Sequence, residues 1–209
     1  EGSFLLQGIY FSKLFKFGNQ PLTFDVNEGN YSVEIKSPSG KYNYIGQYAS
    51  EFPNPKELVG EVTEITIPSQ DVVAAISMTM FASSVEDAFP QYKSLCFDYN
   101  QEGLIVLATD LKRLSSRKMT KYKTDNATRF LCPSKTVGLL KNFLAKENCD
   151  VEFKFDNSTV VIKYNNCTLT SRLVEGKFPN CKVLFDEERP VSVFVNIETL
   201  RIAVSRLVT

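Results

Sequence analysis

The sequence predicts an α+β fold in which helices cover one face of antiparallel sheet. The 209 residues are 43% hydrophobic and 12% aromatic, which is enough to bury a sizeable core. Segments of alternating apolar and polar residues recur along the chain, separated by short polar turns that are typical of β-hairpins. Helical spacing of apolar residues is rarer, and we expect two helices beside roughly six to eight strands in a complete unit.

A long-period repeat organises the chain. The tripeptide Phe-Pro-Asn stands at 52–54 and again at 178–180, an offset of 178 − 52 = 126. The strand, turn and strand pattern of 22–36 likewise returns at 151–163. The sequence therefore contains the end of one unit before the corresponding end of a second.

The beginning of the unit also occurs twice. The strand and helix pattern of 65–82 returns at 193–207, an offset of 193 − 65 = 128. We therefore expect three domains: the C-terminal half of a first unit over 1–60, a complete second unit over 61–188, and the first strand and helix of a third over 189–209.

Each expected strand follows from a local alternating or β-branched pattern. In the complete unit, the predicted strands cover 64–67, 94–99, 104–109, 116–123, 129–132, the hairpin of 151–164, and 168–174. The third unit is expected to open with a strand over 193–196.

Three segments have the spacing of amphipathic helices. They cover 69–83, 134–146 and 197–207, with Ser69 and Asn196 as cap candidates for the first and third. Their apolar series are Val72, Ile76 and Met80; Val137, Leu140 and Leu144; and Leu200, Val204 and Leu207. We expect the second series to be buried against the sheet.

Composition excludes several classes of enzyme. The sequence has no histidine, so Ser-His-Asp triads, Cys-His pairs and His-zinc centres are excluded. The 24 basic and 24 acidic residues balance, which excludes a uniformly basic surface but allows a local basic stripe. We expect no cofactor and no metal.

The cysteines and the absence of long apolar runs indicate the cellular compartment of the protein. The five cysteines are dispersed and contain no CxxC pair, which favours reduced, buried thiols in a cytoplasmic protein. No apolar run approaches the ~18 residues of a membrane span, and residues 1–3 do not begin a signal peptide. We expect no association with membranes.

Three segments carry a resemblance to a known family. Residues 107–114, Leu-Ala-Thr-Asp-Leu-Lys-Arg-Leu, resemble an "ATDxxRL" turn. Residues 170–180 resemble the signature "SRLIEGxFPxY", and 50–55 resemble "ADEFPxxP". These motifs are similar to those of the bacterial sliding clamp, the β subunit of the replicative DNA polymerase. Two positions depart from the pattern: Cys181 replaces an aromatic residue, and Leu111 replaces a Gly that many members carry.

The resemblance implies a DNA-clamp fold and a non-catalytic function. Clamp protomers consist of three such domains, and two protomers form a homodimeric ring around double-stranded DNA without reading its sequence. The ring is a processivity factor for DNA replication, because it tethers the polymerase. Polymerase and clamp-loader subunits bind through short linear peptides. The present chain resembles a partial protomer.

The resemblance also implies two sets of site residues. DNA phosphates would be contacted by basic residues on helices that line the ring, and the candidates are Lys135, Lys146 and Arg206. Helical geometry places Lys135 and Lys146 on one face with Gly138 and Asn142. The residues expected to line an apolar peptide-binding groove are Tyr92, Thr109, Leu111, Arg113, Leu114, Pro179, Val183 and Leu184.

Two alternatives remain open. An enzyme would use Asp71 and Asp110 as general acids or metal ligands, which requires carboxylates that converge in a pocket. A non-catalytic nucleic-acid-binding or scaffold module would require aromatic side chains exposed on a strand face to stack bases. We favour a turn or cap role for Asp110, because isolated carboxylates are weak evidence for catalysis.

Overall fold

The computed structural model describes residues 3–16, 21–181, 183–184 and 190–207. The chain divides into two compact units, Glu1–Glu57 and Leu58–Thr209. The domain boundary predicted at 188 and 189 lies outside the described residues. None of the helices in the described part of the chain is long and apolar enough to cross a membrane.

The described residues of the first unit, 3–16 and 21–57, form one α-helix and two small antiparallel sheets. The predicted hairpin of 22–36 is confirmed, because β2 pairs with β3. Val33 and Ile35 on β3 are buried, as the alternation predicts. The elements are β1 (Phe4–Leu5), α1 (Gly8–Phe15), β2 (Thr23–Val26), β3 (Ser32–Ser37), β4 (Gly40–Ile45), β5 (Gln47–Tyr48) and the 3₁₀ turn η1 (Ala49–Glu51).

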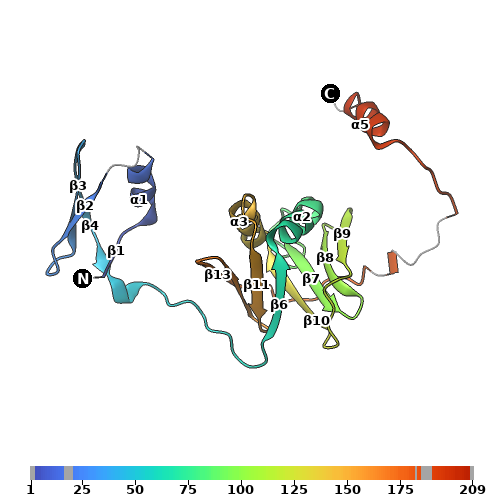
Figure 1. The fold of residues 1–209 in the computed structure, drawn as a ribbon, viewed down its shortest axis with the longest axis horizontal. Helices are drawn as coiled ribbons and strands as arrows, with labels where there is room; N and C mark the ends of the chain where they lie inside the picture. The colour runs from blue at the N-terminus through green and yellow to red at the C-terminus, as the bar shows by residue number, and fades with distance from the viewer. Residues whose placement is uncertain (1–2, 17–20, 182, 185–189, 208–209) are drawn as a thin grey trace. The chain divides into compact units, whose positions relative to one another are not determined.

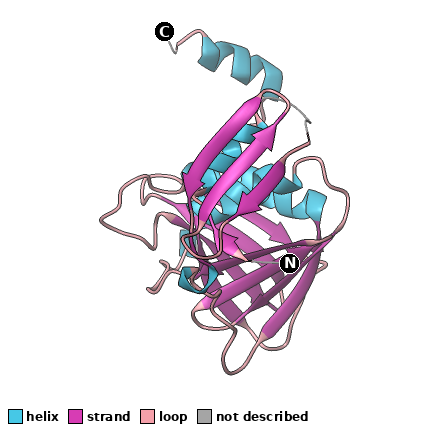
Figure 2. Cartoon of the chain, turned by 90° about the vertical axis from the view of Figure 1, so that its left-hand side faces the viewer, coloured by secondary structure: helices cyan, strands magenta, loops and turns pink. Residues whose placement is uncertain are grey.

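The second unit is built on two four-stranded antiparallel sheets (Figures 1 and 2). One has the strand order β10-β7-β8-β9 and the other β13-β12-β11-β6. Their strands are β6 (Thr63–Pro68), β7 (Ser94–Asn100), β8 (Gly103–Thr109), β9 (Leu114–Met119), β10 (Thr128–Pro133), β11 (Asp150–Phe155), β12 (Thr159–Tyr164) and β13 (Cys167–Arg172). The α+β prediction, with helices gathered on one side of antiparallel sheet, is confirmed.

Two helices cover the same side of this unit and lie next to each other (Figure 1). They are α2 (Ser69–Thr79), continued by the 3₁₀ turn η2 (Met80–Ala82), and α3 (Ser134–Leu144). Close approach is possible because α3 carries a glycine at the contact: a Cβ at Gly138 would lie 3.1 Å from the Cε of Met80.

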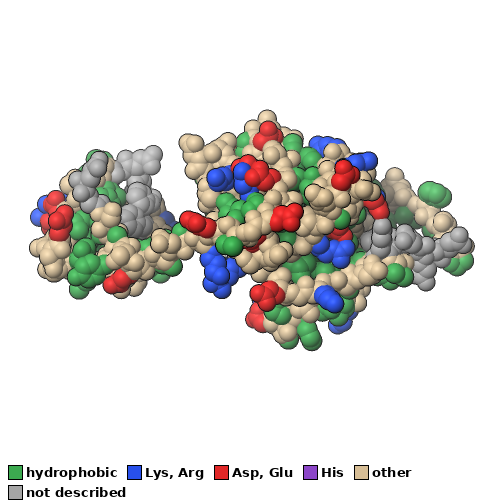
Figure 3. Space-filling view, turned by 90° about the horizontal axis from the view of Figure 1, so that it is seen from below, with side chains coloured by type: hydrophobic (Ala, Val, Ile, Leu, Met, Phe, Trp, Pro, Cys, Tyr) green, Lys and Arg blue, Asp and Glu red, His purple; other side chains and the backbone are tan. Residues whose placement is uncertain are grey.

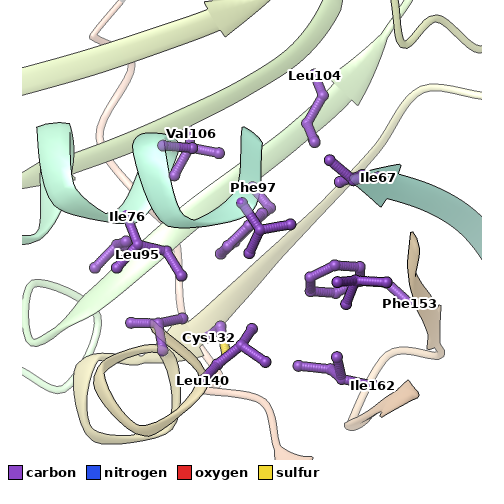
Figure 4. Packing of buried hydrophobic residues seen from close by; sticks show 14 of the residues in the cluster. Ile67, Ile76, Leu95, Phe97, Leu104, Val106, Cys132, Leu140, Phe153 and Ile162 are labelled. Atoms are coloured by element: carbon purple, nitrogen blue, oxygen red, sulfur yellow. The ribbon is translucent and has the colours of Figure 1, made fainter. Parts of the chain in front are cut away.

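The core of the second unit lies between both sheets and both helices (Figure 4). The stripes of the first two helices face the core: Val72 and Ile76 of α2 are buried with the full α3 set, and Met80 is half-buried. The apolar series of the third helix, by contrast, is exposed at Leu200, Val204 and Leu207. Side chains from the two sheets meet them, including Ile67, Leu95, Phe97, Leu104, Val106, Phe153 and Ile162.

Two local predictions were wrong. Ser69 does not cap α2, because its hydroxyl donates to the backbone oxygen of Glu147 (2.8 Å) and Pro68 occupies the N-cap position. The strand predicted over 116–123 begins earlier and ends earlier, as β9. Its start is set by pairing of Leu114 with Thr109. After its end the chain turns, and the hydroxyl of Tyr122 donates to Asp71.

The predicted start of the third unit is correct for the helix and wrong for the strand. Helix α5 (Ile197–Ser205) is capped by Asn196, whose side chain accepts the N–H groups of Glu198 and Thr199. The segment 193–196 forms no strand. In the second unit, Ile67 of β6 pairs with Val151, 151 − 67 = 84 residues downstream.

The cysteines are free thiols, and three are buried as expected: Cys96, Cys132 and Cys181. Burial raises the pKa of the Cys96 and Cys132 thiols to about 12, which makes them poor nucleophiles. Cys167 is exposed, contrary to the expectation of burial, because it follows the tight turn between β12 and β13.

Candidate functional site

The segment after β8, which carries the ATDxxRL-like motif, forms a tight, internally hydrogen-bonded turn. Thr109 is buried, and its hydroxyl donates to the backbone oxygen of Arg113 (2.7 Å) and accepts the N–H of Leu111 (3.0 Å). Asp110 Oδ1 accepts the N–H groups of Lys112 (2.9 Å) and Arg113 (2.7 Å). The Thr and Asp side chains therefore fix the path of residues 109–114.

Asp110 also holds the side chain of Arg113. Its Oδ2 accepts from Arg113 Nε (3.0 Å) and lies 2.9 Å from Nη2. The backbone N–H groups of Arg113 and Lys112, together with this guanidinium, lower the pKa of Asp110 to about 2. The turn role proposed for Asp110 is confirmed. The Arg113 side chain remains 59% exposed and keeps free donors for a ligand.

Leu111 occupies a backbone conformation that favours glycine. Its φ is 71°, in the left-handed region, and the residue is 64% exposed. A glycine would adopt this conformation without the steric contact that a Cβ makes there. Here an exposed leucine side chain is added at the turn.

The second wall of the site is the segment 178–181, which covers the outer face of the sheet that contains β8. Phe178 and Cys181 are buried there, and Leu114 is packed against the same small cluster. The cluster comprises Cys96, Leu107, Leu131, Phe178 and Cys181, with Ile105, Leu114 and Val174 partly buried beside it. The structure thus brings the turn and the Phe-Pro-Asn segment together through Leu114.

A cavity of about 500 Å³ opens beside this cluster. Pro179 lines it together with Ile105 and Leu107 of β8. Ion pairs stand at its border, between Arg129 and Asp98 and between Lys118 and Glu102 (2.7 Å). The surroundings of Pro179 are therefore partly apolar and partly charged.

The remaining groove candidates lie in loops. Tyr92 is half-buried before β7; its N–H donates to Phe89 (3.0 Å) and its backbone oxygen accepts from Ser84 (2.8 Å). Val183 and Leu184 are 64% and 54% exposed. These three residues are accessible or partly so, but their described contacts do not include the 109–114 turn.

Sequence reasoning missed Leu107, Phe178 and Cys181 as parts of this site. A signal was present, because β8 contains apolar residues on both faces: Leu104 and Val106 point into the main core, while Ile105 and Leu107 line the outer cluster. A strand that is apolar on both faces is covered on both sides.

The DNA-facing candidates are exposed. Lys135 stands in the first turn of α3, Lys146 just beyond its end, and Arg206 at the C-terminal cap of α5. The predicted shared face is only partly free, because Gly138 is turned toward Met80 of η2. Figure 3 shows the second unit from the side away from α2 and α3, where acidic and basic side chains are interspersed.

The two carboxylates that an enzyme would require are held by different partners. Asp71 in α2 accepts from the hydroxyl of Tyr122 (2.7 Å) and from Lys121 Nζ (2.6 Å), whereas Asp110 binds Arg113. Lys121, and then Tyr122, lower the pKa of Asp71. Among the described residues, no group of three or more His, Cys, Asp or Glu side chains could hold a metal ion.

Two helices on one side of two antiparallel sheets, with matching elements at an offset of about 127 residues, define a DNA-clamp fold; β3 and β12, for example, begin 159 − 32 = 127 residues apart. The central domain of the DNA polymerase III beta subunit matches residues 66–180, more than half of the chain. The chain belongs to the DNA polymerase III beta subunit family.

Relatives with solved structures share the fold. The beta sliding clamp of Bacillus subtilis (strain 168) is 27% identical over 208 residues, covering 98% of this chain and 54% of that protein. A crystal structure of the DNA polymerase sliding clamp from Bacillus subtilis is 26% identical, with a TM-score of 0.80, covering 90% of this chain and 49% of that one. The DNA polymerase III beta chain of Streptococcus pneumoniae TIGR4 is 25% identical, with a TM-score of 0.83. The match covers 98% of this chain and 54% of that one. The chain spans about half the length of the curated relatives it matches.

Proposed function

We propose that this chain is part of a DNA sliding clamp, a non-catalytic processivity subunit that encircles duplex DNA and tethers the replicative polymerase. The observation that carries the proposal is the repeated clamp unit, whose complete copy matches the beta subunit family over 66–180. The curated relatives bear the name beta sliding clamp. The protein would act in the cytoplasm, where bacterial DNA is replicated.

The chain would contribute part of a three-domain protomer, and two protomers of the whole protein would form a homodimeric ring. Residues 1–60 would be the C-terminal half of domain I, 61–188 all of domain II, and 189–209 the first strand and helix of domain III. In support, α1 and α3 begin 134 − 8 = 126 residues apart, and β4 and β13 begin 167 − 40 = 127 residues apart.

Lys135, Lys146 and Arg206 would contact phosphates of duplex DNA. Phosphate contacts carry no base information, which a protein that slides along DNA requires. Each contact releases counterions, so log K should fall with log salt by about 0.9 per phosphate neutralised. We expect the change Lys135→Gln plus Lys146→Gln to make this slope shallower by about 1.8.

Fluorescence anisotropy of a labelled duplex, titrated with the chain at several salt concentrations, measures that slope. The matched control is Lys163→Gln plus Lys177→Gln, which removes two exposed lysines outside α2 and α3. An equal effect of both double variants would mean that only total charge matters, and the DNA-facing assignment would be rejected.

Peptide tails of polymerase and clamp-loader subunits would bind at the 109–114 turn and Pro179. Leu114 offers apolar surface beside the cluster that contains Phe178, and Arg113 offers exposed donors for the peptide backbone. The hydroxyl hydrogen of Thr109 is used within the turn, so Thr109 would act by shaping it. Tyr92, Leu111, Val183 and Leu184 would complete the groove.

A fluorescent polymerase-tail peptide tests the groove by polarisation. We expect Leu114→Ala plus Pro179→Ala to weaken peptide binding at least tenfold, because both changes remove apolar surface that the peptide would contact. A tenfold change corresponds to about 1.4 kcal/mol of binding free energy. The control variant Leu139→Ala plus Pro190→Ala removes an exposed leucine and an exposed proline elsewhere. Binding by the groove variant equal to that of the parent chain would refute the assignment.

A further inference from the structure

Helix α2 has no basic residue of its own. Its sequence, SQDVVAAISMT, contains one charged side chain, the carboxylate of Asp71. If the helical side of the second unit faces DNA, positive charge beside α2 must come from another element. The adjacent β9 and the loop that follows it contain the basic residues Arg117, Lys118, Lys121 and Lys123.

Strand β9 and its loop lie along α2. At one end, Ser115 Oγ donates to the backbone oxygen of Met78 (2.5 Å), near the C-terminus of α2. At the other end, the hydroxyl of Tyr122 donates to Asp71, in the first turn of α2. Lys118 points into the outer cavity on the opposite face of the sheet, so the side chain of Arg117 is the one that faces α2.

Asp71 is the common partner of the cations on this flank. Lys121 Nζ lies 2.6 Å from its Oδ2 and 4.9 Å from the centre of the Tyr122 ring. The guanidinium of Arg117 interacts electrostatically with the same carboxylate. Among the described residues, Arg117 Nε is a buried donor without a hydrogen-bond partner. Lys121 thus pairs directly with Asp71, and Arg117 contributes positive charge near the same carboxylate.

The group formed by Asp71, Arg117 and Lys121 has an excess of positive charge and one donor without a hydrogen-bond partner. The three ionised side chains sum to one net positive charge, and a buried donor without a partner is unfavourable because it has lost its hydrogen bond to water. The Lys121 side chain is 60% exposed and Asp71 is 28% exposed, so an anion from solvent can reach the pair. An oxyanion here would find a mobile ammonium group and a nearby guanidinium.

We propose that Arg117 and Lys121 form a phosphate-contact site for duplex DNA on the flank of α2, and that Asp71 screens it. The inference rests on the proposed sliding-clamp function. When DNA is bound, a backbone phosphate takes over Lys121 from Asp71; when DNA leaves, the carboxylate takes it back. The lysine exchanges one oxyanion for another, so the net free energy of each contact is small. Such contacts suit a protein that must break them repeatedly while it moves.

The change Asp71→Asn separates this proposal from a structural role. The amide keeps the size of the side chain and can still accept from Tyr122, but it no longer competes for Lys121. We expect Asp71→Asn to bind duplex DNA more tightly, with a salt slope steeper by about 0.9. Lys121→Gln should bind more weakly, with a slope shallower by about 0.9.

The chain offers a matched ion pair as control. Lys154 Nζ lies 2.8 Å from Glu64 and 3.1 Å from Glu152 on the sheet β13-β12-β11-β6, and Glu64 alternates with the buried Ile65 and so points to the opposite face of β6. Glu64→Gln and Lys154→Gln change the net charge by the same amounts as the test variants. Duplex binding is measured by anisotropy across a salt series, with folding of each variant checked by circular dichroism.

A gain with Asp71→Asn that Glu64→Gln lacks supports the inference. Equal effects of Asp71→Asn and Glu64→Gln would overturn it, and so would a loss of affinity in a folded Asp71→Asn variant. If Lys135→Gln plus Lys146→Gln weakens binding while the flank variants do not, the inference alone fails. If the parent chain does not bind duplex DNA at low salt, the DNA-binding part of the proposed function and the inference fail together.

Discussion

Leu111 allows the geometry of the 109–114 turn to be tested by the sign of a stability change. Its φ of 71° is in the left-handed region, where a side chain costs about 1–2 kcal/mol because Cβ approaches the following carbonyl oxygen. Glycine avoids that cost but loses about 0.5–1 kcal/mol more conformational freedom than alanine on folding. We therefore expect Leu111→Gly to be more stable than Leu111→Ala by about 0.5–1 kcal/mol.

The comparison of Gly with Ala removes the contribution of the leucine side chain, which is largely exposed in any case. Leu139, exposed in the middle of α3, is the control position. There Gly should be less stable than Ala by about 1 kcal/mol, so the sign reverses between the two positions. Urea unfolding followed by circular dichroism measures both differences. A Gly variant at 111 that is less stable than its Ala counterpart would show that residue 111 is not held in the left-handed conformation.

Three further predictions concern the core, the turn and the thiols. Leu140→Ala should destabilise the second unit by about 2–5 kcal/mol in urea unfolding, because Leu140 is fully buried between α3 and the sheets. The pKa of Asp110 is lowered in the folded state from 3.8 to about 2, so its stabilising effect is complete above pH 3.8 and is lost as the pH falls through about 2. The difference in unfolding midpoint between the parent and Asp110→Asn should shrink over that range. Cys167 should react with a thiol reagent in the native protein, whereas Cys96 and Cys132 should react only after unfolding, as mass spectrometry of the labelled peptides would show.

The parts of the fold that sequence predicts well depend on near neighbours. The α3 stripe of Val137, Leu140 and Leu144 is set by helical period, and all three are buried. Asn196 caps α5 through N–H groups two and three residues away. Such interactions are local, so a short window of sequence contains both partners.

The wrong predictions depend on partners far along the chain. Ser69 has the residue type of a cap, but its hydroxyl is taken by Glu147, which is 78 residues distant. The 193–196 segment has a strand-like sequence, yet a strand forms only where another strand pairs with it. Local propensity therefore cannot predict the hydrogen-bond partner of Ser69 or the absence of a strand at 193–196.

The contacts of the candidate site likewise fall into two kinds, those between near neighbours in the sequence and those between distant residues. The role of Asp110 follows from its own turn, because an aspartate readily accepts N–H groups two and three residues ahead. The packing of Leu114 against the cluster that contains Phe178 is not local, and family resemblance alone placed Leu114 and Pro179 in one groove. The flank of α2 could not be predicted at all, since nothing in the sequence places Arg117 or Lys121 beside Asp71.

Strand β8 nevertheless shows that some distant contacts leave a local signal. A half-exposed strand alternates apolar and polar residues, but Leu104, Ile105, Val106 and Leu107 are apolar without interruption. The inner pair enters the main core, so the outer pair requires a second cover. Phe178 and Cys181 provide that cover, and they follow the Gly176 turn, where φ is 137°. The apolar outer face of β8 thus holds the Phe-Pro-Asn segment against the sheet, which places Pro179 on the same outer surface as Leu114.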